Sequence, residues 1–199
     1  MIDNLLELPE WLEVCDRYRY DITRFAVEAL GMTYANNQGV TPQQQTLFQS
    51  IVVPGSRTTV ASGHGTGKSR SAGIVALWHL LFYPESVMLF TAPQIGQLRT
   101  VVWKEINICI QRLRNNPILG WLADFIVVLA EKIYIKNFKD TWFVFAKTAP
   151  KHQPTNIAGQ HGDHYMVWAD EACGIDDAVM EVAIGALTHE NNRAVLTSQ

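Results

Sequence analysis

Residues 62–69, with the sequence SGHGTGKS, constrain the fold more than any other part of the chain. They follow a short run at 57–61 that has the pattern of a β-strand, and they precede an apolar run at 68–82 with the length of a helix. Glycines let such a turn wrap a polyphosphate, with main-chain N–H groups pointing inward at the oxygens. The helix N-terminus adds a partial positive charge. The segment therefore predicts a phosphate-binding loop between a strand and a helix.

Each polar side chain of this loop has an expected task. Lys68 is expected to reach the β- and γ-phosphates and to assist catalysis, and the Ser69 hydroxyl to hold Mg²⁺. The sequence departs from the G-x-x-x-x-G-K-[ST] pattern at its first position, where Ser62 stands in place of glycine. The alternative, a flexible glycine turn with a chance GKS, is disfavoured by the flanking strand and helix. The residues expected to contact the nucleotide are Ser62, Gly63, His64, Gly65, Thr66, Gly67, Lys68 and Ser69.

A second signal is the apolar run at 165–169, which ends in two adjacent acids, Asp170 and Glu171. At the carboxyl end of a parallel strand, Asp170 would support Mg²⁺ directly or through water, and Glu171 would polarise the attacking water as a general base. The alternative is that both acids only cap a helix that starts near Gly174. The paired acids favour hydrolysis over phosphoryl transfer to a small acceptor.

The order of elements predicts an α/β fold with a mostly parallel sheet and helices on both faces. An amphipathic helix at 8–30 is expected to precede it, because apolar residues recur there at steps of three and four. The three runs between 125 and 146 are expected to be connected as hairpins. The expected strands are 57–61, 86–92, 125–130, 132–137, 141–146, 165–169 and 194–199. Another helix is expected to begin at Thr41-Pro42, where Thr41 can cap it and Pro42 suits the first helical position. The remaining expected helices cover 68–82, 94–115 and 175–188.

Composition narrows the classes of protein. The chain has 199 residues, 48% of them hydrophobic, and a formal net charge of −3, which excludes a generic polybasic nucleic-acid binder. Three widely spaced cysteines disfavour a disulfide framework or structural zinc and favour a reducing compartment. The acidic N-terminus does not predict a signal peptide. The longest uncharged run, 71–84, is too short to span a membrane, so no membrane partner is expected.

Taken together, these motifs resemble the large terminase subunit of tailed bacteriophages, the ATP-driven motor that packages DNA. ASGHGTGKS is similar to the Walker A loop of that family and MVWADEA to its Walker B strand. TPQQQ at 41–45 resembles the adenine-recognising glutamine motif, TAPQ at 91–94 resembles segment Ia, and LTSQ at 196–199 resembles the motif that couples hydrolysis to movement. The match covers about residues 40–199 and implies a P-loop NTPase fold of the ASCE or RecA-like type.

The resemblance also implies a function and partners. ATP with Mg²⁺ would be hydrolysed to power translocation of viral double-stranded DNA into a procapsid. Gln44, or Gln45 as the fallback, would recognise adenine, and Thr197, Ser198 and Gln199 would couple hydrolysis to movement. The expected partners are DNA, the small terminase subunit, the portal protein and further copies of this chain in a ring. The expected location is the cytoplasm of the infected bacterium, and transiently the procapsid portal.

The same resemblance divides the chain and exposes two departures from the family. Residues 1–40 would form an N-terminal helix and linker, and 41–199 an ATPase domain that is truncated at its C-terminus. The phosphate loop lacks the arginine that many terminases carry there, so Arg57, Arg70 or Arg99 is a candidate replacement. The nuclease domain of the family is expected to be absent from this chain, and no nuclease activity is expected.

Other readings stay open at this point. A superfamily 2 helicase-like DNA-dependent ATPase shares the glutamine motif and segment Ia, but it needs a second RecA-like lobe. A non-hydrolysing interaction fragment would instead dock through the helix at 8–30, and the paired acids argue against a small-molecule kinase. Lysines at 132, 136, 139, 147 and 151 lie among aromatic residues and suggest DNA contact. The favoured reading of that region is a solvated face of lysines over core aromatics.

Overall fold

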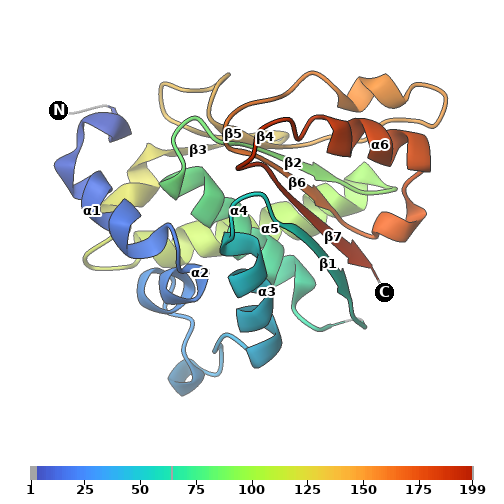
Figure 1. Ribbon diagram of the computed structural model, residues 1–199. Coiled ribbons are helices and arrows are strands. Elements are labelled where there is room, and N and C mark those ends of the chain that lie inside the picture. The colour runs from blue at the N-terminus through green and yellow to red at the C-terminus, as the bar shows by residue number, and fades with distance from the viewer. Residues whose placement is uncertain (1–3, 64, 199) are drawn as a thin grey trace.

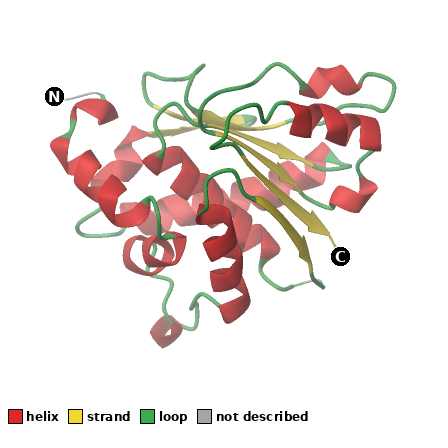
Figure 2. Cartoon of the chain, in the orientation of Figure 1, coloured by secondary structure: helices red, strands yellow, loops and turns green. Residues whose placement is uncertain are grey.

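The computed structural model describes residues 4–63 and 65–198, whose strands form one seven-stranded sheet (Figures 1 and 2). The strands are β1 (Arg57–Ala61), β2 (Val87–Thr91), β3 (Ile126–Val128), β4 (Lys132–Ile135), β5 (Phe143–Ala146), β6 (Tyr165–Ala169) and β7 (Arg193–Ser198). The α-helices are α1 (Pro9–Tyr18), α2 (Ile22–Arg24), α3 (Pro42–Val52), α4 (Lys68–Phe82), α5 (Ile95–Arg114) and α6 (Asp177–Gly185). Among these described helices, none combines the length and apolar character that crossing a membrane requires.

The strand order is β1-β7-β6-β2-β5-β4-β3. The first five strands run parallel, whereas β5, β4 and β3 pair antiparallel, as the predicted hairpins require. The prediction of a mostly parallel sheet is therefore confirmed. β7 is the last strand in the chain, yet it lies between β1 and β6, so it adjoins both the glycine-rich loop and the acidic pair.

Helices cover both faces of the sheet, which explains why the sequence of β6 is continuously apolar. Met166 and Trp168 pack into the core cluster on the side of α4 and α5, while Tyr165 and Val167 pack into the cluster on the side of α6. Figure 1 shows α6 on one side of the sheet and α3, α4 and α5 on the other. A strand that is buried on both faces has no reason to alternate with polar residues.

The N-terminal region differs from the prediction of one helix at 8–30. α1 ends at Tyr18, and a second helical segment begins at Ile22 and continues as a π-helix at Phe25–Ala29. The cause is Asp21, whose carboxylate accepts a hydrogen bond from the Arg24 backbone N–H at 2.8 Å. This side chain caps a new helix and offers the backbone an alternative to continuing the old one. The apolar side of α1 packs against α4 in the main core.

Side-chain donors from separate segments bind the last four carbonyl oxygens of α4, which have no partner within the helix. Two of the donors are buried indole N–H groups, one from α1 and one from the residue before β5. The pairs are Ser86 to His79 (2.9 Å), Trp142 to Leu80 (2.7 Å), Trp11 to Leu81 (2.8 Å) and Arg19 to Phe82 (2.8 Å). These bonds connect α1 and the β4–β5 hairpin to the C-terminus of α4.

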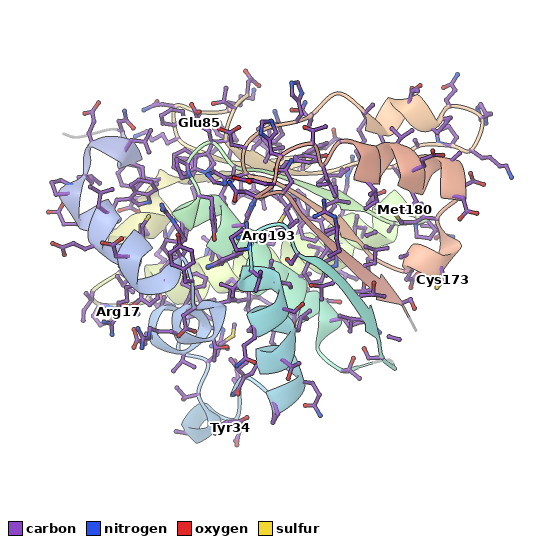
Figure 3. All side chains as sticks on the ribbon, in the orientation of Figure 1. Arg17, Tyr34, Glu85, Cys173, Met180 and Arg193 are labelled. Carbon is purple, nitrogen blue, oxygen red and sulfur yellow. The ribbon has the colours of Figure 1, made fainter. Side chains whose placement is uncertain are left out.

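Arg193, the first residue of β7, is 1% exposed and lies inside the molecule (Figure 3). Its guanidinium donates to the carbonyl oxygens of Ile51 at 2.8 Å and Val52 at 3.1 Å, at the C-terminus of α3. It also stacks over the rings of Trp78 and Tyr83. Its binding partners among the described residues are carbonyl and hydroxyl oxygens rather than a carboxylate. The negative end of the α3 dipole therefore compensates the buried cation, while burial lowers its pKa.

His79 gives the stability of this core a pH dependence. Its side chain is 1% exposed, and within the described residues neither ring nitrogen has a hydrogen-bond partner. Burial, followed by the charge of Arg193 and the neighbouring His164, lowers the pKa of His79 well below its ordinary value. The folded state therefore keeps this imidazole neutral, whereas the unfolded chain takes up a proton below about pH 6.5. The free energy of unfolding should fall as the pH falls through that value.

Urea unfolding at about pH 8 and about pH 5.5 measures this dependence. His79→Leu should make it shallower, because the substitution removes a group that only the unfolded chain protonates. Burial also lowers the pKa of His164, so part of the dependence should remain. His152→Leu is the matched control, since it makes the same substitution at an exposed position of the folded protein. A native-like dependence in the His79→Leu protein would assign the acid sensitivity to other groups.

Candidate nucleotide-binding site

A pocket of about 540 Å³ lies at the carboxyl ends of the parallel strands, where open α/β sheets bind ligands. Its walls come from the glycine-rich loop, the start of α3, the first half of α5 and the ends of β6 and β7. Most of the residues that the sequence singled out line this pocket. They are Gln44, Gly65, Thr66, Gly67, Lys68, Ser69, Asp170, Glu171 and Ser198.

The conformation of the loop requires glycine at two positions. Gly65 has φ +73° and Gly67 has φ +87°, both in the left-handed region that side chains disfavour. A Cβ atom on Gly67 would also lie 3.0 Å from the Gln44 side-chain nitrogen. These two glycines turn the chain from β1 into α4 and bring the loop against α3.

Side chains within the loop bind its own carbonyl oxygens. The Thr66 hydroxyl donates to the Gly63 oxygen at 3.0 Å, and the Lys68 ammonium donates to the oxygens of Ser62 and Gly63. A bound phosphate would offer Lys68 a charged acceptor in place of these neutral ones. His64, also predicted to contact the nucleotide, lies outside the described residues.

β7 connects the two halves of the site. The Thr197 hydroxyl donates to Asp170 Oδ1 at 2.6 Å, and Thr197 itself is 1% exposed. One residue on, the Ser198 carbonyl accepts the backbone N–H of Ser62 at 3.2 Å, where the loop begins. Residues 197 and 198 therefore contact both the acidic pair and the loop. Gln199, the third predicted coupling residue, lies outside the described residues.

Glu171 has an unusual backbone conformation, with φ 50° and ψ 45°. Non-glycine residues rarely adopt the left-handed region, and such strain gathers at functional sites. Its exposed side chain is not a helix cap. α6 begins only at Asp177, and its cap is Asp176, whose carboxylate accepts the Ala178 N–H at 3.1 Å. The capping role that was the alternative for the acidic pair thus belongs to another residue.

Gln44 lines the pocket, but its side-chain oxygen and nitrogen both already have hydrogen-bond partners within the protein. Its oxygen accepts the Thr41 backbone N–H at 3.1 Å, completing a capping box at the start of α3. Its nitrogen donates to the Ser71 hydroxyl at 3.1 Å and approaches the Gly67 carbonyl at 3.4 Å. The direct contact of this side chain is therefore with the phosphate loop. To bind adenine, the amide would have to give up these partners. Gln45, the fallback, donates to the Val40 carbonyl at 3.4 Å.

The three candidate arginines occupy different places. Arg70 is exposed and lines the pocket. Arg57 lies at the amino end of β1, the end of that strand away from the phosphate loop, and donates to the Asn192 carbonyl at 2.6 Å. Arg99 lies on a different face of α5 from the residues that line the pocket, and it pairs with Glu131 at 2.9 Å. Within one subunit, only Arg70 of the three faces the pocket.

Four residues of the pocket wall were not predicted from the sequence: Gly39, Leu98, Val101 and Glu105. The last three follow Gln94 at steps of four, three and four, which places them on one face of α5. This periodicity was visible in the sequence, but it does not distinguish a helix face that lines a pocket from one that lines the core. Leu98 and Val101 give this wall an apolar part.

The side chains present fit Mg²⁺. Ser69 supplies a hydroxyl and Asp170 a carboxylate, and both line the pocket. Within residues 4–63 and 65–198, no group of three or more His, Cys, Asp or Glu side chains could hold a metal. Mg²⁺ needs no such cage, because it binds through one or two carboxylates together with substrate phosphates and water.

These features define a class of protein. The glycine-rich loop follows β1, the acidic pair follows β6, and β7 separates the two strands in a mainly parallel sheet. A strand, a loop with Lys68 and Ser69 and a helix form the phosphate-binding unit of P-loop NTPases. The chain therefore has the fold of a RecA-like P-loop NTPase, as predicted.

Comparisons with known proteins make the assignment more particular. No family model matches the chain. The chain is 31% identical over 191 residues to the probable terminase large subunit of Enterobacteria phage P7, covering 96% of this chain and 37% of that protein. The large terminase ATPase domain of Thermus phage P74-26 has a TM-score of 0.59 at 19% identity, over 86% of this chain and 67% of that one.

A third relative is a solved large terminase from a thermophilic bacteriophage, in complex with ADP. It has a TM-score of 0.54 at 11% identity and covers 73% of this chain and 34% of that one. The chain spans 37% of the length of the phage P7 protein. These likenesses confirm the predicted resemblance to the ATPase domain of phage large terminase subunits.

Proposed function

We propose that this chain is the ATPase part of a phage large terminase subunit, which hydrolyses ATP to drive double-stranded DNA into a procapsid. The observation that carries this proposal is the meeting of two motifs in one pocket. The Lys68–Ser69 end of the phosphate loop and the Asp170–Glu171 pair line the same cavity, although about a hundred residues separate them in the sequence. ADP in a related terminase supports the same ligand class here.

The proposed chemistry follows from the positions of four side chains. The loop N–H groups and Lys68 would bind the phosphates of ATP and stabilise the charge that develops during transfer. Ser69 and Asp170 would hold Mg²⁺, which would neutralise phosphate charge when bound. Glu171, exposed at the mouth of the pocket, would accept a proton from the attacking water. Gln44 would hold Gly67 in place beneath the nucleotide.

Coupling would run through β7, because Thr197 and Ser198 contact both motifs. Thr197→Val is expected to lower ATP turnover about 10- to 100-fold, since a hydrogen bond to a charged group contributes about 1.5–3 kcal/mol. Steady-state phosphate release measures the effect. Thr197→Ser keeps the hydroxyl and should restore most of the activity. Native turnover in the Thr197→Val protein would show that hydrolysis does not need the hydrogen bond from Thr197 to Asp170.

The partners and the division of the chain are part of this proposal. A ring of several copies would act on DNA at the procapsid portal in the host cytoplasm, with the small terminase subunit and the portal protein as partners. Residues 41–199 would be the ATPase unit and 1–40 its N-terminal helical region. The interaction-fragment alternative would dock through the helical region at 8–30. There Trp11, Cys15 and Tyr18 are buried, while Leu12 and Tyr20 are exposed, so nucleotide binding and not burial separates that alternative from the proposed enzyme.

Phosphate release from ATP with Mg²⁺, measured with and without duplex DNA, tests the proposal. Hydrolysis that DNA stimulates is the expected result. Strand displacement on a forked duplex is measured in parallel, since unwinding would favour the helicase-like alternative. A chain that releases no phosphate in either condition would refute the proposed function.

A further inference from the structure

A second pocket, of about 600 Å³, lies beside the nucleotide pocket and carries an excess of basic residues. Its walls are the β3–β4 turn, the segment between β4 and β5, the end of β5 and the first part of α5. Four of its residues are basic, and one is acidic, Glu131. We name it the basic groove, after its basic residues Arg99, Lys132, Lys139 and Lys147.

Ion pairs neutralise only part of this charge. Arg99 pairs with Glu131 at 2.9 Å, and Lys132 pairs with Asp140 at 3.4 Å. Lys139 and Lys147 are both exposed, and in the described part of the chain neither has an ion-pair partner. Two uncompensated cations at the mouth of an open groove favour a polyanionic ligand.

The aromatic residues of this region offer little surface for stacking on bases. Trp142 is fully buried and Phe143 is 3% exposed, so both belong to the core, as the favoured reading of the sequence had it. Phe145 is only half-buried and lies in the wall of the groove. With one half-buried ring beside four basic side chains, the groove favours contacts to backbone phosphates over base recognition.

The groove and the nucleotide pocket share a helix. Leu98 and Val101 of α5 line the nucleotide pocket, while Arg99, between them in sequence, lines the groove. Arg99 also reaches the Ala146 carbonyl at the end of β5, at 3.4 Å. A ligand in the groove would thus contact the same helix that forms a wall of the nucleotide pocket.

We infer that the basic groove binds the sugar-phosphate backbone of duplex DNA without regard to sequence. The identity of the polyanion rests on the proposed function, whereas the placement of the site rests on the groove itself. Lys139 and Lys147 would contact phosphates directly. Glu131 would oppose binding and hold Arg99 in position when DNA is absent.

Fluorescence anisotropy with a labelled duplex oligonucleotide, over a series of salt concentrations, tests this inference. Each lost phosphate contact reduces the slope of log K against log salt by about 0.9. The Lys139→Ala/Lys147→Ala protein should therefore lose about 1.8 from the slope and bind about tenfold or more weakly at low salt. Glu131→Gln should change affinity in the opposite direction and bind more tightly.

The matched control is Lys104→Ala/Lys151→Ala, which removes two other exposed lysines that lie outside the groove. It should bind DNA like the native chain. An equal loss in both double variants, or no loss in the groove variant, would overturn the inference, as would a native chain that binds no duplex.

ATP hydrolysis by the native chain without DNA is measured separately. If hydrolysis fails while the groove variant alone loses DNA affinity, the proposed function is refuted and the groove remains a DNA site. If hydrolysis occurs while the groove variant binds like the native chain, only the groove is refuted. Circular dichroism of every variant excludes unfolding as the cause of a loss.

Discussion

Glu171→Gln is expected to reduce ATP turnover by about 10²–10⁴-fold, the usual contribution of a general base. The amide has nearly the same shape as the carboxylate, but it cannot accept a proton from the attacking water. Nucleotide binding should persist, because Lys68, Ser69 and the loop are unchanged. Phosphate release at saturating ATP and Mg²⁺ measures turnover, and a fluorescent ATP analogue measures binding.

Glu181→Gln is the control for this experiment. Glu181 is an exposed glutamate of α6 that lies outside the pocket, so its variant should hydrolyse ATP like the native chain. Near-native turnover in Glu171→Gln would reject Glu171 as the base. Loss of nucleotide binding together with turnover would instead show that the residue maintains the strained turn after β6.

Trp142→Ala is expected to lower the free energy of unfolding by about 3–5 kcal/mol, the usual cost of deleting a large buried aromatic side chain. The indole has no exposed surface, and its rings pack edge-on against Trp11 and Phe138. Its loss also leaves the Leu80 carbonyl without its donor. Urea unfolding followed by circular dichroism measures the change.

Two further variants separate the causes. Trp142→Phe keeps an aromatic ring but removes the N–H donor, so it should cost less than the alanine substitution. Trp121→Ala truncates a partly buried tryptophan that packs on Phe125, and it should also cost less. A loss from Trp142→Ala no larger than that from Trp121→Ala would contradict the central place of Trp142 in the core.

The parts of this molecule that the sequence predicts are those with local causes. The phosphate loop, the strand before the acidic pair and the cap of α3 at Thr41 each depend on a few adjacent residues. The break in the N-terminal helix also has a local cause, the cap at Asp21, but a helical periodicity on both sides conceals it.

The remaining features depend on distant contacts that no local pattern encodes. Arg193 reaches the end of α3 across more than a hundred residues, and its sequence neighbours do not indicate that it is buried. The wall of the nucleotide pocket at Val101 and Glu105 follows from how α5 packs beside α4. The contact between Thr197 and Asp170 likewise requires β7 to lie next to β6.

The position of β7 has a consequence for how this protein is made. Arg57 in β1 pairs with Ala194 in β7, and Ala194 pairs in turn with Val167 in β6. Until β7 has been synthesised, the backbone N–H and C=O groups of β1 and β6 that pair with it therefore have no hydrogen-bond partner from β7. Parallel pairings between strands far apart in the sequence form slowly, and until they form they leave hydrophobic surface and unpaired strand edges exposed to aggregation. We expect the nascent chain to depend on chaperones until residue 198 has emerged, and only then to acquire its capacity for nucleotide.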